Sequence, residues 1–138
     1  MSTFQLNIIT PDQSFFAGEV EMVIARTTEG DMAVLKGHSP FAAPLVVSEI
    51  RIKQNDQYRH AACAGGFISV TKEMTTIITD SAEWAENIDA ARAAAAKERS
   101  EHRLNTESAD VDMARAKAAL ARSMNRLRVI DRSKQSNQ

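Results

Sequence analysis

Glycine and proline divide this chain of 138 residues into two regions with different structural rules. All five glycines and all three prolines lie before residue 67. Because both residue types mark turns and interrupt regular elements, the first region suits short strands and the second suits long helices. The sequence therefore predicts a domain at residues 1–86, a second at 87–133 and a disordered tail at 134–138.

Alternating residues predict the class of the first domain. The runs FQLNIIT, EVEMVIART, EIRIKQ and MTTIITD are short, rich in β-branched residues and separated by turn-like segments. In EVEMVIART, Val20, Met22 and Ile24 are expected to share one face, and in EIRIKQ, Ile50 and Ile52 alternate with charged residues. Strands spaced in this way predict an antiparallel β-sandwich, or flattened barrel, from about residue 3 to about residue 84.

The second domain is expected to form two antiparallel helices. Residues 88–132 contain neither glycine nor proline, and alanine and arginine, both good helix formers, dominate their start. We expect Asn87 to cap the first helix, with Asp89 in its first turn. The segment NTESAD, residues 105–110, is rich in turn and cap residues and is expected to separate the helices. The fold class is thus an N-terminal β-sandwich followed by a C-terminal antiparallel two-helix hairpin.

The contact between these helices is expected to be weak. Residues at three- and four-residue spacing predict an apolar stripe on the second helix, comprising Met113, Ala116, Leu120, Met124 and Leu127. The facing stripe on the first helix would be Ile88, Ala91 and Ala95. Because alanine buries little area, at roughly 25 cal/mol per Å², we expect the hairpin to be less stable than the sandwich and able to open.

Composition excludes several classes of partner. A net charge of −1 gives no electrostatic basis for binding nucleic acid or an anionic membrane. The start of the chain lacks the basic and apolar segments of a signal peptide, and no apolar run approaches the ~20 residues of a membrane span. Cys63 is the single cysteine, so no internal disulfide can form, and its spacing from His60 and His102 does not suit a metal. We expect no nucleic-acid partner, no membrane insertion and no metal site.

Charged residues of the expected hairpin could converge. Asp89 and Arg92 share a helix face, and Arg99 lies two turns further along it. If the hairpin turns near residue 107, Arg126 faces Asp89 and Arg122 faces Arg92. Guanidinium groups match phosphate oxygens, so an anion site is one interpretation. The other is a set of exposed side chains that pair across a solvated helix surface. Spacing alone leaves both open.

Several motifs, taken in order, resemble the epsilon subunit of the F-type ATP synthase. They are EGDMAVLKGHSPF, AGGFISVTKEMTTIITDSAE, IDAARA and DVDMARAKAALARSMNRLRVID, and they cover almost the whole chain. The sequence departs from the family at Ala33, where glycine is frequent, and at Lys36, where proline is frequent. Both changes could alter the loop that faces the rotor.

The resemblance implies ATP as a regulatory ligand. In bacterial members that bind ATP, the IDAARA motif and arginines of the second helix hold the hairpin folded. The positions that match here are Glu83, Asp89, Arg92, Arg99, Arg122 and Arg126. The chain has no G-x-x-x-x-G-K-[ST] loop and no acid pair suited to magnesium and a base, so we expect binding without turnover and no required cofactor.

The resemblance also implies partners and a place. The chain would be a non-catalytic rotor subunit that binds the gamma subunit and the membrane c-ring, on the cytoplasmic side of a bacterial plasma membrane. Expected ring contacts are Glu29, Gly30, Asp31 and His38. An extended hairpin would reach the alpha/beta catalytic head and block ATP hydrolysis through Arg115, Lys117, Arg122, Arg126 and Arg128.

Two other functions stay open on the sequence. One is a free-standing ATP sensor or adaptor that uses the same hairpin without a motor. The other is a small hydrolase that uses His38 or Cys63, although no complete acid–base arrangement accompanies either residue in the local sequence.

Overall fold

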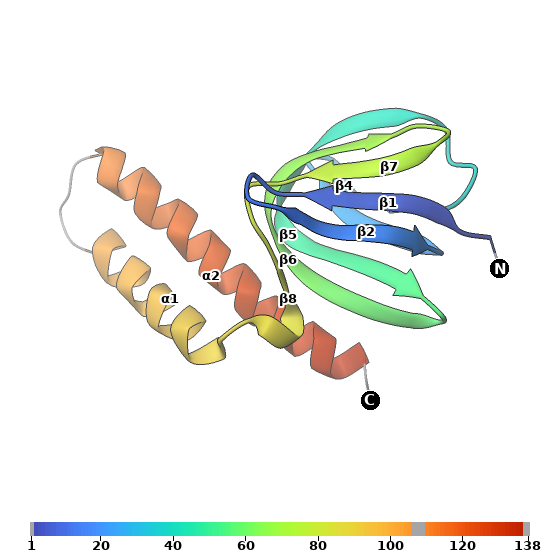
Figure 1. The fold of residues 1–138 in the computed structure, drawn as a ribbon. Helices are drawn as coiled ribbons and strands as arrows, with labels where there is room; N and C mark the ends of the chain where they lie inside the picture. The colour runs from blue at the N-terminus through green and yellow to red at the C-terminus, as the bar shows by residue number, and fades with distance from the viewer. Residues whose placement is uncertain (1, 106–109, 137–138) are drawn as a thin grey trace. The chain divides into compact units, whose positions relative to one another are not determined.

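The computed structural model describes residues 2–105 and 110–136. The chain forms two compact units, Met1–Trp84 and Ala85–Gln138. The first is built from β-strands and the second from a short 3-10 turn and two α-helices (Figure 1). The predicted fold class is therefore confirmed, and the boundary lies two residues before the predicted one.

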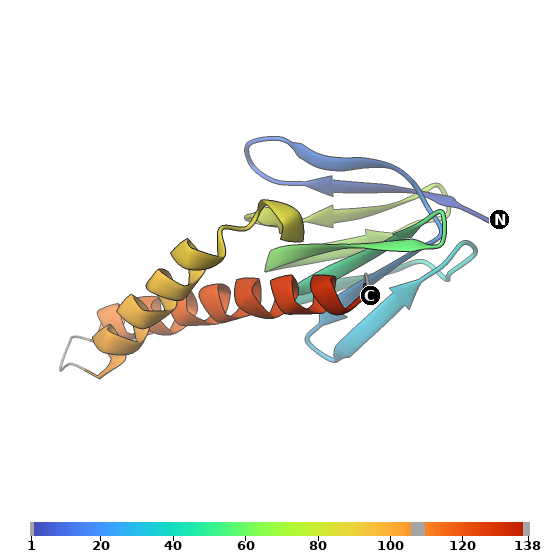
Figure 2. The ribbon, with the colours of Figure 1, turned by 90° about the horizontal axis from the view of Figure 1, so that it is seen from below.

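The strands of the first unit form one continuous sheet that folds over into two layers (Figures 1 and 2). Their order is β2-β1-β7-β6-β5-β3-β4, with β8 paired to β6. Neighbours are antiparallel except for β1 and β7, which run parallel. The bounds are β1 Phe4–Ile9, β2 Ser14–Val20, β3 Met22–Thr27, β4 Gly30–Val34, β5 Phe41–Gln54, β6 Gln57–Val70, β7 Met74–Ile78 and β8 Ala82–Trp84.

The two long strands, β5 and β6, belong to both layers. One half of their ladder lies beside β7 and the other half lies beside β3 and β8. Glycines permit the bend on β6, because Gly65 and Gly66 have φ values of +89° and +131°. A Cβ atom on Gly66 would lie 2.0 Å from the carbonyl oxygen of Ile78, so the close approach of the backbones at these two residues requires glycine at position 66.

Aliphatic side chains fill the space between the layers. Leu6, Ile8 and Ile52 are completely buried, and the predicted inward position of Ile52 is confirmed. The predicted face of EVEMVIART is wrong, because Glu21 interrupts the run between β2 and β3. Its N–H donates to the carbonyl of Lys53 at 2.8 Å, and on β3 it is Val23, rather than its neighbours, that is completely buried.

The second unit consists of η1 (Ala85–Asn87), α1 (Ala90–Leu104) and α2 (Asp110–Ser136). Asp89, rather than Asn87, caps α1, and its Oδ1 accepts a hydrogen bond from the N–H of Arg92 at 3.1 Å. Asn87 instead lies in the 3-10 turn. Of the segment expected to separate the helices, residues 106–109 lie outside the described residues.

α2 is longer than expected. It continues to Ser136, so residues 134–136 of the predicted disordered tail are helical. Residues 137–138 lie outside the described part of the chain. Lys134 in the last turn carries the charge that the negative end of a helix favours.

Small residues form the buried stripe that α1 presents to α2. Ala93 is 4% exposed and Ser100 is 3% exposed. The predicted stripe is wrong for Ala91 and Ala95, which are exposed, whereas Ile88 ahead of the helix is buried. A run of four alanines fits several helix faces equally well, so tertiary contact decides which one is buried.

Along the three–four repeat of α2, Ala116 and Ser123 are buried, whereas Leu120 and Leu127 are half-buried. Ser123 is completely buried and donates to the carbonyl of Leu120 at 3.0 Å. It replaces the predicted Met124, which is 36% exposed. The helices lie side by side in both views (Figures 1 and 2), and the residues buried along the two stripes include Ala93, Ser100, Ala116 and Ser123.

Candidate functional site

Four arginines lie along one side of the helical hairpin. At about 100° per residue, Arg92 and Arg99 are rotated to one side of the buried stripe of α1. Arg122 and Arg126 are rotated in the same sense from the stripe of α2. Because antiparallel helices face each other, equal rotations away from the shared contact lead to the same side of the pair. We call this side the arginine flank.

The arginine flank extends along most of the hairpin. Arg103 and Arg115 fall on it by the same periodicity. The described acids of α1, Glu98 and Glu101, fall on the other side, where Glu101 pairs with Lys97 at 3.8 Å. The arginines of α1 therefore lie on one side of that helix, and its described glutamates lie on the other.

Much of this charge is accessible. Arg92, Arg99 and Arg122 are exposed, and within residues 2–105 and 110–136 the structure records no ion pair for these three. Arg126 is half-buried and takes part in a further interaction. Within the part of the chain that the structure describes, an external anion would therefore not have to displace an ion-pair partner of Arg92, Arg99 or Arg122.

The start of α1 adds to this environment. The cap by Asp89 fixes the first turn, so the N–H groups at the positive end of the helix lie beside Arg92. The carboxylate of Asp89 is thus engaged with the backbone of its own helix. Glu83 lies in β8, in the other unit, and is not among the residues that the hairpin itself brings together.

The described residues favour an anion over a metal at this place. Among them, no group of three or more histidine, cysteine, aspartate or glutamate side chains could hold a metal ion. Guanidinium groups bind phosphate oxygens directly and need no bridging cation. Within the same residues, no helix is long and apolar enough to cross a membrane.

The expected ring contacts fall at two separate places. Glu29 and Gly30 form the β3–β4 turn, where the hydroxyl of Thr27 accepts from the N–H of Glu29 at 3.1 Å and donates to the carbonyl of Gly30 at 3.0 Å. His38 lies beyond the other end of β4. A strand of this length spans about 17 Å, so these residues do not form one contiguous patch.

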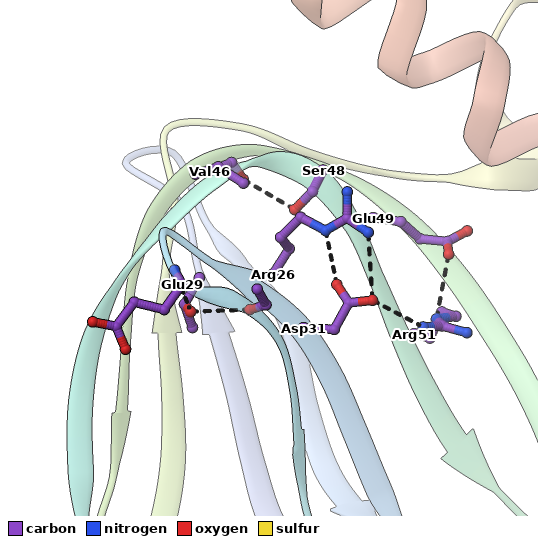
Figure 3. Close-up of polar contacts among 9 residues, drawn as sticks. Arg26, Glu29, Asp31, Val46, Ser48, Glu49 and Arg51 are labelled. Carbon is purple, nitrogen blue, oxygen red and sulfur yellow. Dashed lines mark hydrogen bonds and ion pairs between the residues drawn. The ribbon is translucent and has the colours of Figure 1, made fainter.

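Asp31 belongs to a network of ion pairs on the sheet (Figure 3). Its carboxylate accepts from Nε of Arg26 at 2.8 Å and lies 3.9 Å from Arg51. Arg51 in turn lies 3.4 Å from Glu49, whose other oxygen is 2.9 Å from Nδ1 of His60. The hydrogen bond and charge of Asp31 raise the pKa of Arg26. Asp31 therefore already serves a structural role between strands.

His38 lines a cavity of about 540 Å³ at its end of the sandwich. Its Nδ1 lies 2.8 Å from the carbonyl of Ser39, and its ring lies 5.1 Å from that of Phe41. The loop that follows β4 and the turn between β6 and β7 form the rim. The contacts of His38 are those of a loop-ordering residue.

Cys63 is 2% exposed, with Sγ 3.3 Å from the hydroxyl of Thr79 and 3.4 Å from the carbonyl of Gly65. Burial raises the pKa of this thiol, so the neutral form persists in the range where a nucleophile would have to ionise. The structure thus removes the reactivity on which a cysteine hydrolase would depend.

An exposed apolar row crosses the outer face of one layer, and the sequence reasoning missed it. Ile9, Ile78 and Phe67 are 40%, 57% and 46% exposed. They are neighbours in register across β1, β7 and β6, and Pro44 of β5 continues the row. The signal in the sequence is two pairs of adjacent isoleucines, since one residue of each pair must point outward. Exposed apolar rows of this kind mark contact surfaces.

Comparison with known proteins defines the class. Residues 3–85 match the model of the ATP synthase delta/epsilon chain β-sandwich domain. Residues 86–131 match the model of the long α-helix domain of the same chains. The chain therefore belongs to the ATP synthase delta/epsilon family, among its epsilon chains.

Bacterial relatives carry the epsilon assignment. The ATP synthase epsilon chain of Alkaliphilus oremlandii is 49% identical over 109 residues, covering 79% of this chain and 81% of that one. The epsilon chain of Bacillus subtilis is 43% identical over 110 residues, covering 80% and 83%. Epsilon chains are stalk subunits rather than catalytic ones, so the hydrolase alternative loses its basis.

Solved structures share the fold. A chain in the Euglena gracilis mitochondrial ATP synthase OSCP/F1/c-ring structure matches with a TM-score of 0.81 at 22% identity, covering 91% of this chain and 79% of that one. A chain of the Tetrahymena thermophila mitochondrial ATP synthase central stalk and c-ring matches with a TM-score of 0.66 at 10% identity, covering 92% and 96%. At these identities the comparison shows the fold alone.

Proposed function

We propose that this chain is a non-catalytic central-stalk subunit of a bacterial ATP synthase whose helical hairpin is a nucleotide-sensitive brake on ATP hydrolysis. The arginine flank carries this proposal. It offers several guanidinium groups and a helix N-terminus on one side of a hairpin whose helices meet through small residues.

The flank suits the triphosphate of ATP. Arg92 and Arg122 lie at the same level of the hairpin, since their positions are equally far from its turn, and Arg126 lies one helical turn beyond Arg122. Three guanidinium groups from two helices can share the oxygens of one phosphate chain. Asp89 supports them through the cap of α1, and Arg99 extends the site along the same helix.

Binding of this kind would hold the two helices together. If α1 and α2 separate, the arginines divide into two pairs and neither helix alone presents the whole set. A ligand shifts a conformational equilibrium only by its difference in affinity for the two states. ATP therefore favours the closed hairpin because the complete site exists only there.

The open hairpin supplies the inhibition. An extended α2 would carry basic side chains toward acidic segments of the alpha/beta catalytic head, and these residues are Arg115, Lys117, Arg122, Arg126 and Arg128. Two of them, Arg122 and Arg126, belong to both proposed interactions. ATP binding and inhibition would then compete for the same side chains.

The sandwich would connect the gamma subunit of the stalk to the c-ring. We assign the apolar row at Ile9, Ile78 and Phe67 to the gamma subunit, because its exposed area would be buried on assembly. One end of the sandwich would meet the c-ring, and the turn at Glu29 and Gly30 is our choice because Asp31 is already paired. The subunit would then sit peripherally on the cytoplasmic side of the plasma membrane.

Calorimetric titration of the purified chain with ATP tests the site. We expect saturable binding, and Arg122→Ala to weaken it at least tenfold, or about 1.4 kcal/mol. Arg128→Ala, on the same helix but off the flank, is the matched control and should bind normally. Absence of binding at millimolar ATP would refute the nucleotide site.

In the assembled complex, deletion of the residues after 87 should raise ATP hydrolysis, and an unchanged rate would refute the brake.

A free-standing ATP sensor is the remaining alternative. It would share the nucleotide site but would not assemble with a motor. The epsilon assignment favours the stalk subunit, and co-purification of the chain with gamma and the c-ring distinguishes the two.

A further inference from the structure

The last residue of the sandwich unit, Trp84, is held on both faces of its ring. The ring of Phe15 stacks on it with centroids 4.5 Å apart and 27° between the planes. The guanidinium carbon of Arg59 lies 3.6 Å from the same centroid. Two groups this close must occupy opposite faces, and Phe16 meets the ring edge at 6.0 Å. Trp84 is thus clamped, and its faces are closed to a nucleotide base.

Arg59 reaches Trp84 from the neighbouring strand. Trp84 is paired with Ala61 across β6 and β8, and Arg59 lies two residues before Ala61 on the same side of β6. This is the diagonal arrangement that long side chains bridge in antiparallel sheets. Because β8 has only three residues, its ladder is short and its attachment depends heavily on the contacts of its side chains.

The chain beyond Trp84 forms a short 3-10 turn, in which Ala85 is buried. η1 spans three residues, and the N–H of Ile88 donates to the carbonyl of Ala85 at 3.3 Å. Glu86 and Asn87 are exposed. Asp89 then begins the capped helix α1. A short 3-10 turn therefore separates a clamped strand from a capped helix, and it is the segment that can change conformation with least loss of structure.

We infer that Arg59 is a positioning residue that clamps Trp84 and thereby confines the pivot of the hairpin to Ala85–Asn87. Strand β8, including Glu83, then stays on the sandwich whether the hairpin is closed or open. As far as it concerns ATP, this inference rests on the proposed function, since Glu83 is one of the residues expected to bind the nucleotide. The clamp itself stands on the contacts of the sandwich alone.

A glutamate-specific protease tests the inference, because Glu83 and Glu86 lie on either side of the proposed fixed point. With the full-length chain under native conditions and mass spectrometry of the products, we expect cleavage after Glu86 well before cleavage after Glu83. Arg59→Ala should accelerate cleavage after Glu83 at least tenfold and make the single tryptophan more accessible to acrylamide quenching. Arg59→Lys keeps the charge but lacks the planar group, so it should fall between the two.

Two controls separate a local clamp from general stability. Lys53→Ala removes another cation–aromatic contact of the sandwich, with Nζ 5.9 Å from the ring centre of Tyr58, and should leave Glu83 protected. Cleavage after Glu49, which is 8% exposed, should stay unchanged in Arg59→Ala. If Glu49 and Glu83 became accessible together, Arg59 would act on the whole fold and the inference would be overturned.

The remaining outcomes are also decisive. Equal cleavage after Glu83 and Glu86 in the unmodified chain would overturn the clamp, as would an Arg59→Ala variant with unchanged cleavage and quenching. If the clamp holds but the chain does not bind ATP, the proposed nucleotide site fails and the pivot stands. If both hold, Arg59→Ala should also weaken ATP binding severalfold, with the Arg59→Lys value in between.

Discussion

The sandwich and the hairpin are held together by different means. The sandwich buries large aliphatic side chains such as Leu6, Ile8 and Ile52 completely. The hairpin contact buries Ala93, Ser100, Ala116 and Ser123, which contribute far less apolar area. A bulky core favours one packed arrangement, whereas a contact between small residues can be broken and remade. The difference predicts that the sandwich is the more stable unit and the hairpin the one that can open.

The largest effect is expected in the sandwich, at Gly66. Gly66→Ala would place a methyl group against the backbone of Ile78 and force a residue with φ of +131° into strain. We expect a loss of at least about 3 kcal/mol of unfolding free energy, measured by urea denaturation. Gly18→Ala is the matched control, because the added Cβ would lie 3.5 Å from the ring of Phe16 in ordinary contact. Equal stability of the two variants would contradict this account.

The closed hairpin should be destabilised by a larger side chain at the contact between its helices, because the residues there are already small. Ala116→Leu would overfill a site that is 2% exposed and should cost the closed hairpin about 2 kcal/mol. Hydrogen exchange should accelerate in α1 and α2 while the amides of β5 and β6 keep their protection. Exchange that accelerates equally in both units would show that they unfold together. Ala118→Leu, at an exposed position of the same helix, is the control.

A smaller effect is expected at the start of α1. Asp89→Ala removes the cap and should destabilise the helix by about 1 kcal/mol, seen as faster exchange in its first turns. Asp89→Asn keeps a capping oxygen and removes the charge, so it should preserve the helix. ATP titration of both variants then separates the roles. Loss of binding in the asparagine variant would assign Asp89 to the nucleotide directly, rather than through the cap.

The last prediction concerns the reactivity of Cys63, which depends on pH. Burial raises the pKa of its thiol, so less thiolate forms than in an unfolded chain at any pH up to the unfolded value, about 8.5. Reaction with a thiol reagent at pH 8 should therefore be at least about 100-fold slower in the native chain than in urea. Rapid reaction of Cys63 in the native chain would show that the sandwich opens locally around this residue. This part of the sandwich would then be as easily opened as we expect the hairpin to be.

The fold could be predicted from the sequence wherever a residue pattern fitted only one type of secondary structure. Alternation identified Ile50 and Ile52 as core residues, and the absence of glycine and proline identified the helices. The stripe of α1 could not be predicted, because alanine at Ala91 and Ala95 is compatible with exposure or burial. The parallel pairing of β1 with β7 depends on long-range contact that no local pattern encodes.

Part of the candidate site could be predicted because the residues of a helix repeat at a regular spacing. The residues of the arginine flank are visible in the sequence because helical spacing is regular. The expected grouping of Glu29 with His38 was not supported, since β4 separates them, and spacing along a chain does not reveal which end of a strand a residue occupies. The clamp on Trp84 joins β2, β6 and β8, so it becomes visible only after those strands are assembled.

The continuity of β5 and β6 has a mechanical consequence. In many sandwiches, the two layers are joined through side-chain packing and loops, and a sideways load can make them slide past each other. Here, two strands of fourteen residues run from one layer into the other. Torque applied to one layer therefore passes to the other along covalent backbone, and the sandwich can turn as a stiff body.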